Sequence, residues 1–382
     1  MGNVESNQLM ERKRTNLMAN AIRSICTLLF GGTRHSSKKP PAFIIGLSAW
    51  RPYLEDWFGN EKIHKFGRNI SWLRFYLAVA PIILADPRSK VYVWAYKHPS
   101  FVKNFCRAWD VPLIRVEDGF IRSVALGATR APPLSLCFDS SSLYFDATAA
   151  SDLEKIIQTY NFDANTEIMV RAREGIERLI ATKLSKYNTS YDADVEKLYG
   201  PKLRRRVLVL GQVEDDASIK LGCKKRLSNN DVVRTAAMEN PNAQIIYKPH
   251  PEILHGTRPA QSNPDEVRDI ALVLDTDISL ADSLQTIDHV YTITSLSGFE
   301  ALLRGIEVTC LGMPFYAGWG VTDDRQICER RTVKRSVAEI FAAAYILYAR
   351  YFDPIRHCTA TFEEALELLA SMTQQARSSR MS

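Results

Sequence analysis

Short apolar runs separated by longer amphipathic stretches dominate the chain from residue 41 onward. Runs of about four to eight apolar residues between polar ones are typical of buried strands. The first series of predicted strands comprises residues 42–47, 91–95 and 112–116. The segments between them are long enough for crossover helices, which is the βαβ pattern of a parallel sheet covered on both faces. The pattern therefore predicts an α/β domain.

A second series of apolar runs follows a polar, basic stretch at residues 199–206. Its predicted strands are residues 207–211, 244–248, 271–274 and 289–293, and they alternate with predicted helices. Two successive Rossmann-like units with a cleft between them form the GT-B architecture, which is the fold class that we expect. Open α/β sheets bind ligands at the carboxyl ends of their strands.

The remaining patterns complete the predicted domain organisation. Two apolar runs, residues 134–138 and 142–145, predict a hairpin. Helices are predicted at residues 153–157, 168–184, 336–350 and 362–372. We expect a basic N-terminal extension and linker over residues 1–40, a first Rossmann-like domain over 41–200, a second Rossmann-like domain over 201–335, and C-terminal helices over 336–382. Packing of these helices back on the N-terminal domain is one arrangement of that last segment.

The N-terminal extension combines apolar residues at helical spacing over residues 10–30 with the cations Arg12, Lys13, Arg14 and Arg23. This pattern is typical of a helix that lies in a membrane interface, and equally of an ordinary helix docked on the protein body. Both interpretations stay open. No segment approaches the roughly 20 apolar residues that span a bilayer.

Composition narrows the class of protein. The chain has 382 residues, of which 46% are hydrophobic and 24% are charged, as in a soluble globular protein of two domains. The seven cysteines are scattered and odd in number, which indicates a reducing compartment, and none has the spacing of a zinc site. The net charge of +6 favours anionic partners. Because no nucleic-acid-binding motif accompanies the charge, a membrane surface or an acidic substrate explains it.

Distinctive polar clusters follow four of the predicted strands. They are Glu117 and Asp118, residues 212–218, residues 249–251 and residues 294–300. A sugar transferase needs a carboxylate that deprotonates the acceptor or attacks the anomeric carbon, and groups that neutralise the departing phosphate. Glu117 and Asp118 belong to the first half and Asp215 and Asp216 to the second, so a closed cleft would place carboxylates on both sides of one sugar ring. Paired carboxylates at short separation permit retention in glycosidases.

Phosphate-binding groups are also present at these positions. Lys248 and His250 end a strand, while Ser295 and Ser297 precede a predicted helix near Gly298, whose amides would bind phosphate. Glu300 falls in the first turn of that helix, where it either caps the helix or binds a ribose hydroxyl.

Each cluster also has a purely structural interpretation. The EDG segment is a common turn, and the SxSGFE segment reads as a helix cap. Asp215 and Asp216 have no further dedicated oxygen ligands nearby, so a solvated loop is favoured over a metal site, and we expect neither a metal nor another cofactor. His250, between two prolines, has the most distinctive setting, because the rigid backbone fixes its imidazole.

Several longer stretches together resemble one family. They are EDGFIRSVALGATRAPPLSLCFDSSSLYFDAT, KLSKYN, GQVEDDASI, IIYKPHPEIL and TSLSGFEALLRGIEVTCLGMPFYAGWGVTDDR. In unbroken order they closely resemble the KpsC family of capsule β-Kdo transferases, especially its second catalytic half, over about residues 41–369.

The resemblance implies a retaining GT-B transferase that moves Kdo from CMP-Kdo to a β-linked Kdo oligosaccharide on a phospholipid. It also implies that residues 41–200 form the acceptor-side domain and residues 201–335 the CMP-sugar-binding domain. By matching motifs, Asp216 would be the nucleophile, Glu117 and Asp118 would supply acid/base function, and Gln212 would lie beside the reacting sugar. The implied substrate-binding residues are Lys248, His250, Ser295, Ser297, Gly298, Glu300, Arg122 and Tyr316. His250 and the two serines would contact the CMP phosphate, Lys248 and Glu300 would support nucleotide binding, and Arg122 and Tyr316 are candidates for the Kdo carboxylate or acceptor.

The resemblance also implies a cytoplasmic enzyme that is peripheral on the inner membrane. The implied partners are CMP-Kdo, a lipid-linked Kdo acceptor, the inner-membrane surface and other capsule-assembly proteins, without nucleic acid. KpsC proteins carry two catalytic modules in tandem, whereas this chain has length for one. Two alternatives stay open: a GT-B transferase for another CMP- or UDP-sugar, and a non-catalytic capsule-assembly subunit.

Overall fold

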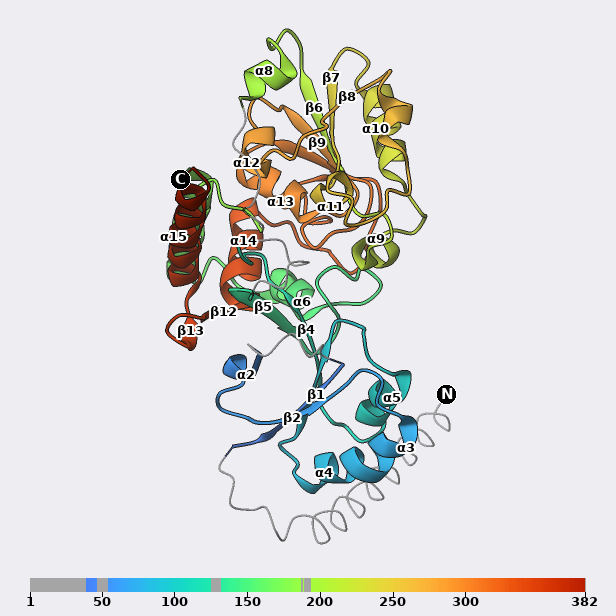
Figure 1. Cartoon of the computed structure of the whole chain (residues 1–382), viewed down its shortest axis with the longest axis vertical. Coiled ribbons are helices and arrows are strands. Elements are labelled where there is room, and N and C mark those ends of the chain that lie inside the picture. Colours follow the sequence, from blue (N-terminus) through green and yellow to red (C-terminus); the bar gives the residue numbers. More distant parts are fainter. Residues whose placement is uncertain (1–38, 47–53, 125–131, 187, 189–193, 382) are drawn as a thin grey trace. The chain divides into compact units, whose positions relative to one another are not determined.

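The computed structural model describes residues 39–46, 54–124, 132–186, 188 and 194–381 (Figure 1). The predicted N-terminal helix lies outside the described residues. The chain forms two compact units, Met1–Glu117 and Asp118–Ser382, which we call unit 1 and unit 2. Among the described residues, no helix combines the length and the apolar character that crossing a bilayer requires.

Unit 1 is built on parallel strands in the order β2–β1–β3–β4. Their bounds are Pro41–Ile45 (β1), Lys62–Phe66 (β2), Lys90–Trp94 (β3) and Leu113–Asp118 (β4). The helical segments are α2 (Leu54–Trp57), α3 (Trp72–Arg74), η1 (Phe75–Val79), α4 (Ala80–Ala85) and α5 (Ser100–Ala108). A strand forms at each of the three predicted positions, residues 42–47, 91–95 and 112–116, although residue 47 lies outside the described residues. Strand β2 escaped prediction because its two lysines and His64 interrupt the apolar pattern, as is common at a sheet edge.

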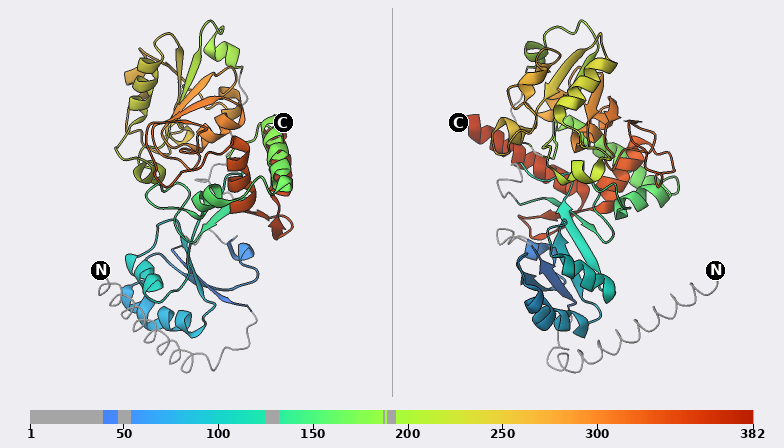
Figure 2. Two further views of the ribbon diagram at one scale, coloured as in Figure 1. Left: turned by 180° about the vertical axis from the view of Figure 1, so that it is seen from behind. Right: turned by 90° about the vertical axis from the view of Figure 1, so that its right-hand side faces the viewer.

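Unit 2 contains a parallel sheet in the order β11–β10–β9–β6–β7–β8, which we call the C-terminal sheet (Figures 1 and 2). Its strands are β6 (Arg206–Leu210), β7 (Gln244–Lys248), β8 (Leu272–Val273), β9 (His289–Thr292), β10 (Glu307–Cys310) and β11 (Asp323–Asp324). The helical segments among them are α8 (Val195–Tyr199), α9 (Ala217–Gly222), α10 (Asn229–Glu239), α11 (Pro251–Leu254), η3 (Pro264–Val267), α12 (Leu280–Ser283) and α13 (Leu296–Leu303). Strand β6 is buried throughout, so apolar side chains fill both faces of the sheet. The prediction of an α/β chain with parallel sheets is confirmed.

The predicted hairpin at residues 134–145 is wrong. Strand β5 (Ser135–Asp139) forms, but it pairs antiparallel with the distant β12 (Ala349–Asp353), which pairs in turn with β13 (Cys358–Ala360). The Asp139 carboxylate accepts hydrogen bonds from the backbone N–H groups of Ser141 and Ser142, at 2.8 and 2.9 Å. These bonds turn the chain away from a returning strand, because they occupy the donors that a ladder would need.

The predicted helix at residues 336–350 also ends differently. It comprises α14 (Val337–Phe341) and the π-helical η4 (Ala342–Tyr348), and residues 349–350 already belong to β12. The last helix, α15 (Phe362–Met381), packs on α7 (Thr166–Ala181), where Arg171 Nε lies 2.8 Å from Glu363 Oε1. A Cβ atom on Gly175 would approach the Phe362 ring to 2.6 Å, so glycine permits this close packing.

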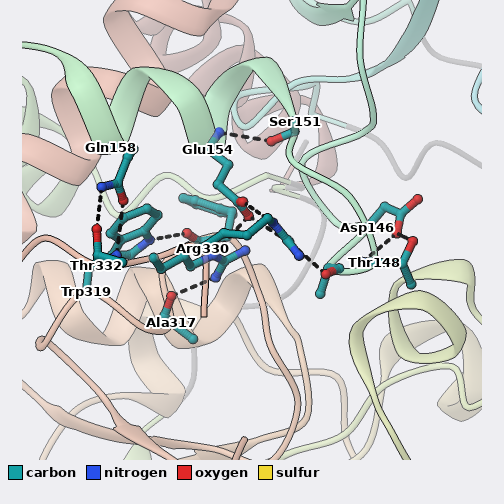
Figure 3. A network of polar contacts seen from close by, with 12 residues as sticks. Asp146, Thr148, Ser151, Glu154, Gln158, Ala317, Trp319, Arg330 and Thr332 are labelled. Atoms are coloured by element: carbon teal, nitrogen blue, oxygen red, sulfur yellow. Dashed lines mark hydrogen bonds and ion pairs between the residues drawn. The ribbon is translucent and has the colours of Figure 1, made fainter. Parts of the chain in front are cut away.

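A buried carboxylate ties the middle of unit 2 to the segment that follows β11 (Figure 3). Glu154 of α6 (Asp152–Thr159) accepts from Arg330 at 2.7 Å and from Arg331 at 3.1 Å. Arg330 also donates to the carbonyl of Ala147, and Arg331 donates to the carbonyl of Ala317. The Glu154 network therefore joins the turn before α6 to the segment at residues 314–332.

Candidate functional site

The C-terminal ends of three neighbouring strands meet at one edge of the C-terminal sheet. Leu210 at the end of β6 lies opposite Lys248 of β7 on one side and opposite Thr292 of β9 on the other. The polar segments that follow these strands therefore emerge side by side. This is the position at which open parallel sheets bind ligands, and we call it the strand-end site.

Gln212 and Thr294 link two of these strand ends. The Thr294 N–H donates to Gln212 Oε1 at 2.7 Å, and Gln212 Nε2 donates to Thr294 Oγ1 at 3.2 Å. Asn229 at the start of α10 holds the Gln212 backbone, because it accepts from the Gln212 N–H and donates to the Gln212 carbonyl, both at 2.9 Å. The side chain of Gln212 is buried and engaged in positioning the site. The sequence analysis included Thr294 in the cluster at residues 294–300 without giving it a role, and it missed Asn229, since an isolated polar residue carries no motif.

The two adjacent aspartates have different surroundings. Asp216 is the N-cap of α9, where its Oδ1 accepts from the Ser218 N–H at 2.8 Å, and the residue is exposed. Asp215 instead pairs with Arg258, and that hydrogen bond lowers the pKa of the Asp215 carboxyl. Of the two carboxylates, Asp216 is thus the one held by a single backbone contact and open to a substrate.

His250 is held in one orientation and in its neutral form. Its Nδ1 accepts a hydrogen bond from the Glu252 N–H at 3.2 Å, so in the neutral ring the proton resides on Nε2. Burial, together with the neighbouring Lys248 ammonium, lowers the pKa of His250 to about 4, although Asp216 acts in the opposite direction. At neutral pH the imidazole is therefore an uncharged donor beside the Asp216 carboxylate.

Lys248 contributes a buried cation to the same edge. Its side chain is 6% exposed, and its Nζ lies 3.7 Å from Asp277 Oδ1. Burial lowers the pKa of Lys248, and the Asp277 carboxylate partly opposes this shift. His255 Nε2 lies 3.1 Å from the other Asp277 oxygen. The sequence analysis missed Asp277, although it follows β8 and obeys the same strand-end rule.

The start of α13 forms another wall of the strand-end site. Ser295 caps the helix by accepting from the Ser297 N–H at 3.2 Å, and the Tyr316 hydroxyl donates to the Ser295 carbonyl at 2.5 Å. A Cβ atom on Gly298 would lie 2.3 Å from the Tyr316 hydroxyl oxygen, so only glycine fits over this tyrosine. Tyr316 is fully buried and supports the capping loop from beneath.

Glu300 lies one turn further along α13 and is 2% exposed. Burial raises the pKa of its carboxyl to about 7, and Arg304 and the backbone of Lys186 limit the shift. Its described neighbours, which include Lys186 and Tyr345, belong to the packing behind α13. The carboxyl is thus poised to lose its proton near neutral pH.

Asp118 is supported by a buried arginine. Arg122 Nε lies 2.8 Å from Asp118 Oδ2, and Arg122 also donates to Ser123 Oγ at 2.9 Å. The Arg122 side chain is 1% exposed and is therefore fixed by its surroundings. Its contact with Asp118 holds that carboxylate in place. Glu117 is half-buried in β4 and belongs to unit 1.

Tyr144 connects Asp118 to the strand-end site. Its hydroxyl donates to the Asp118 carbonyl at 3.3 Å. The ring also lines a small hollow with neighbours that include Thr294. The residues around this hollow are Tyr144, Phe145, Thr294, Leu296, Pro314 and Phe315. The Glu154 network reaches one wall of this hollow, because Arg331 donates to the carbonyl of Pro314.

The structure thus brings most of the predicted residues together. Gln212, Asp216, Lys248, His250 and the Ser295–Gly298 turn surround one sheet edge, and Asp118 is connected to it through Tyr144. Carboxylate, neutral imidazole, buried ammonium and helix amides form a set that can bind a phosphate and present a nucleophile. Within the described ranges, no group of three or more His, Cys, Asp or Glu side chains is arranged to hold a metal ion.

Comparisons with known proteins agree on one family. Residues 90–352 match the family model described as capsule polysaccharide biosynthesis protein. The chain is 44% identical over 334 residues to the lipopolysaccharide-processing protein LpsZ of Rhizobium meliloti, covering 87% of this chain and 75% of that protein. It is 37% identical over 328 residues to the capsule polysaccharide modification protein LipA of Neisseria meningitidis, and there it spans 45% of the relative's length.

The solved structures that are similar to this chain include two of Thermosulfurimonas dismutans KpsC. The β-Kdo 2,4 transferase has a TM-score of 0.72 at 31% identity, with 88% of this chain and 100% of that chain covered. The β-Kdo 2,7 transferase has a TM-score of 0.66 at 31% identity, with 87% and 99% covered.

Proposed function

This chain belongs to the capsule polysaccharide biosynthesis protein family, and on that premise we propose that it is a retaining glycosyltransferase that transfers Kdo from CMP-Kdo to a lipid-linked, Kdo-terminated acceptor. The observation that carries the proposal is the strand-end site, in which the exposed Asp216 carboxylate lies near the neutral His250 and the buried Lys248. The similarity to two β-Kdo transferases supports the choice of sugar.

In the first half of the proposed reaction, an Asp216 oxygen attacks the anomeric carbon of Kdo. The bond between that carbon and the CMP phosphate oxygen breaks, and CMP departs with the electron pair. The His250 Nε2–H, the Lys248 ammonium and the amides at the start of α13 neutralise the departing phosphate. The product of this half is a glycosyl ester on Asp216.

In the second half, an acceptor hydroxyl attacks the same carbon from the opposite face, and the Asp216 carboxylate leaves. A base removes the hydroxyl proton as the glycosidic bond forms. Asp118 is our candidate for this base, since Arg122 and Tyr144 fix its position. Glu117 shares the acid/base function in the proposal. Two inversions give net retention.

We also propose that the transfer needs no metal ion. Lys248, His250 and the helix amides supply the positive potential that a divalent cation provides in other nucleotide-sugar enzymes. Activity that is unchanged after dialysis against EDTA is expected. Loss of activity on chelation, with recovery on adding Mg²⁺ or Mn²⁺, contradicts this part of the proposal.

The acceptor side of the proposal places the enzyme at the cytoplasmic face of the inner membrane, where other capsule-assembly proteins would meet its product. This location follows from a lipid-linked acceptor. Cell fractionation that recovers the protein away from membranes in a capsule-producing strain would contradict it.

The donor experiment decides the function. Purified protein is incubated with a synthetic Kdo-terminated acceptor in parallel reactions, each of which contains one donor. The donors are CMP-Kdo, a CMP-sialic acid and a UDP-sugar. Extension of the acceptor with CMP-Kdo alone is expected. Extension with another donor alone identifies a different transferase, and no extension with any donor, by protein that binds CMP, indicates a non-catalytic subunit.

A further inference from the structure

Unit 1 carries an apolar surface on α3 and η1. Trp72, Leu73 and Leu77 are 57%, 59% and 71% exposed, and we call these three residues the Trp72 patch. Because η1 is π-helical, with the Ala80 N–H bonded to the Phe75 carbonyl five residues earlier, one turn of it spans between about four and five residues. Leu77 therefore follows Leu73 by about one turn, and Trp72 directly precedes Leu73, so the three exposed side chains lie on one side of the segment.

The patch is held firmly from behind. Phe75 is fully buried and packs on Phe101 and Phe105 of α5, with ring centroids 5.4 and 5.2 Å apart. Tyr76 packs on Phe105 and also on the Trp72 ring, at 6.0 and 4.9 Å. The apolar residues of this segment thus separate into a face that fills the core of unit 1 and a second face that meets solvent. Grouped exposed apolar side chains of this kind mark interaction surfaces.

Basic residues predominate near the patch along the chain. Between residues 62 and 85 every charged residue is basic: Lys62, Lys65, Arg68 and Arg74. The acidic residues that border this range, Glu61 and Asp86, pair with Lys90 and Arg88. Lys103 and Arg107 are exposed on α5, which packs beside η1. An apolar centre bordered by cations matches a partner that combines negative charge with an apolar interior.

We propose that the Trp72 patch inserts into the surface of an anionic lipid bilayer, while Arg68, Arg74 and the cations of α5 contact lipid phosphates. The Trp72 indole suits this position, because amphipathic aromatic rings favour the headgroup level of a membrane. Leu73 and Leu77 reach the acyl boundary, and the long basic side chains extend toward phosphates. The Trp72 patch belongs to unit 1 and shares no residue with the strand-end site, which belongs to unit 2. The inference therefore does not rest on the proposed function.

Vesicle flotation of the full chain tests the inference. Wild-type protein is expected to float with vesicles of phosphatidylglycerol and phosphatidylcholine, less with phosphatidylcholine alone, and less at high salt. The Trp72→Ser/Leu77→Ser variant should lose about tenfold or more in its partition coefficient, because it removes two apolar side chains from the interface. Arg74→Glu should weaken binding mainly at low salt.

The matched control is Met238→Ser/Ile355→Ser, which removes two side chains that are 75% and 69% exposed on unit 2. Its partition should equal that of the wild type. Should the Trp72→Ser/Leu77→Ser variant fold poorly, Leu73→Ser and Arg74→Glu carry the test instead.

Three results overturn the inference. The first is equal vesicle binding by wild type and patch variants. The second is a patch variant that melts at a lower temperature and still binds vesicles as well as the wild type. This result would mean that the patch packs against another segment of the same chain. The third is a wild-type dimer in analytical ultracentrifugation that the patch variant abolishes without a change in vesicle binding, which assigns it to a second copy.

Discussion

Gln212 and Thr294 hold each other through two hydrogen bonds across the C-terminal sheet, with the Thr294 N–H donating at 2.7 Å and the Gln212 amide donating at 3.2 Å. The pair joins the ends of β6 and β9 directly beside Asp216 and Ser295. The partners of the Gln212 side chain explain why position 212 holds an amide and not a charged group. A buried charge would need a counter-charge, and Thr294 supplies none.

Removing either partner should uncouple the two strand ends. We expect Gln212→Leu to reduce the free energy of unfolding by about 1–3 kcal/mol, since it leaves the Thr294 N–H buried without its acceptor. Thr294→Val should cost less, because the bond from the Thr294 N–H to Gln212 is kept and only the two longer hydroxyl contacts, with Gln212 and Ser218, are lost. A double-mutant cycle measured by urea unfolding should give a coupling of about 0.5 kcal/mol or more. Strict additivity contradicts the linkage.

Asp216 and Asp215 offer a matched pair for testing the nucleophile. Asp216→Asn keeps the α9 cap, because asparagine caps helices as well as aspartate does, so stability should change by less than about 0.5 kcal/mol. Transfer should nevertheless fall by about 10³-fold or more, as expected when a nucleophile is removed. Asp215→Asn, which loses only the exposed contact with Arg258, should keep transfer within about threefold.

A trapped intermediate gives an independent readout for Asp216. Wild-type protein mixed with the donor alone should gain the mass of one Kdo residue on the peptide that contains Asp216. Wild-type activity of Asp216→Asn, or an adduct on another residue, removes Asp216 from the mechanism.

His250 predicts a specific pH dependence of stability. Its pKa is about 4 in the folded chain and 6.5 ordinarily, so between these values the unfolded chain binds more protons. Its effect is therefore to lower the free energy of unfolding as the pH falls from about 6.5 toward about 4, and to leave it unchanged above this window.

The test compares His250→Asn with the wild type by urea unfolding at pH 7.5 and pH 5. Asparagine can accept the same cap hydrogen bond from the Glu252 N–H. The variant should lose less stability over this interval, by on the order of 1 kcal/mol. His357→Asn is the control, since that histidine is exposed. Identical slopes for wild type and His250→Asn contradict the depressed pKa.

The Glu154 network predicts a large effect on stability at residues that no step of the proposed reaction uses. Glu154→Ala leaves the Arg331 guanidinium, which is 2% exposed, without its carboxylate. The loss should be about 3–5 kcal/mol. Glu367→Ala is the control, because its pair with Arg178 is half-exposed and should contribute less than about 1 kcal/mol. Thermal unfolding of both variants measures the difference, and equal melting temperatures would show that the network has no structural role.

Local sequence was a good guide wherever an element is set by its own residues. The buried strands β1, β3, β6, β7 and β9 follow from uninterrupted apolar runs, and the polar clusters after them follow from the rule that ligands meet strand ends. Strand β2 was missed because an edge strand needs no apolar run. The hairpin at residues 134–145 was predicted wrongly, because the true partner of β5 lies more than 200 residues later in the chain.

The sequence by itself therefore determined the α/β character, the family resemblance and the candidates Asp216, His250 and Lys248, since each depends on short-range pattern and residue chemistry. Only the tertiary structure decided the surroundings of those residues. In the structure, Arg122 contacts Asp118 and Tyr316 supports the Ser295 carbonyl. The Gln212 side chain is bonded to Thr294. Asp216 is exposed, and burial lowers the pKa of His250. These properties depend on burial and on partners distant in the chain, and no local pattern encodes the free energy of desolvating a side chain or the residue that compensates for it.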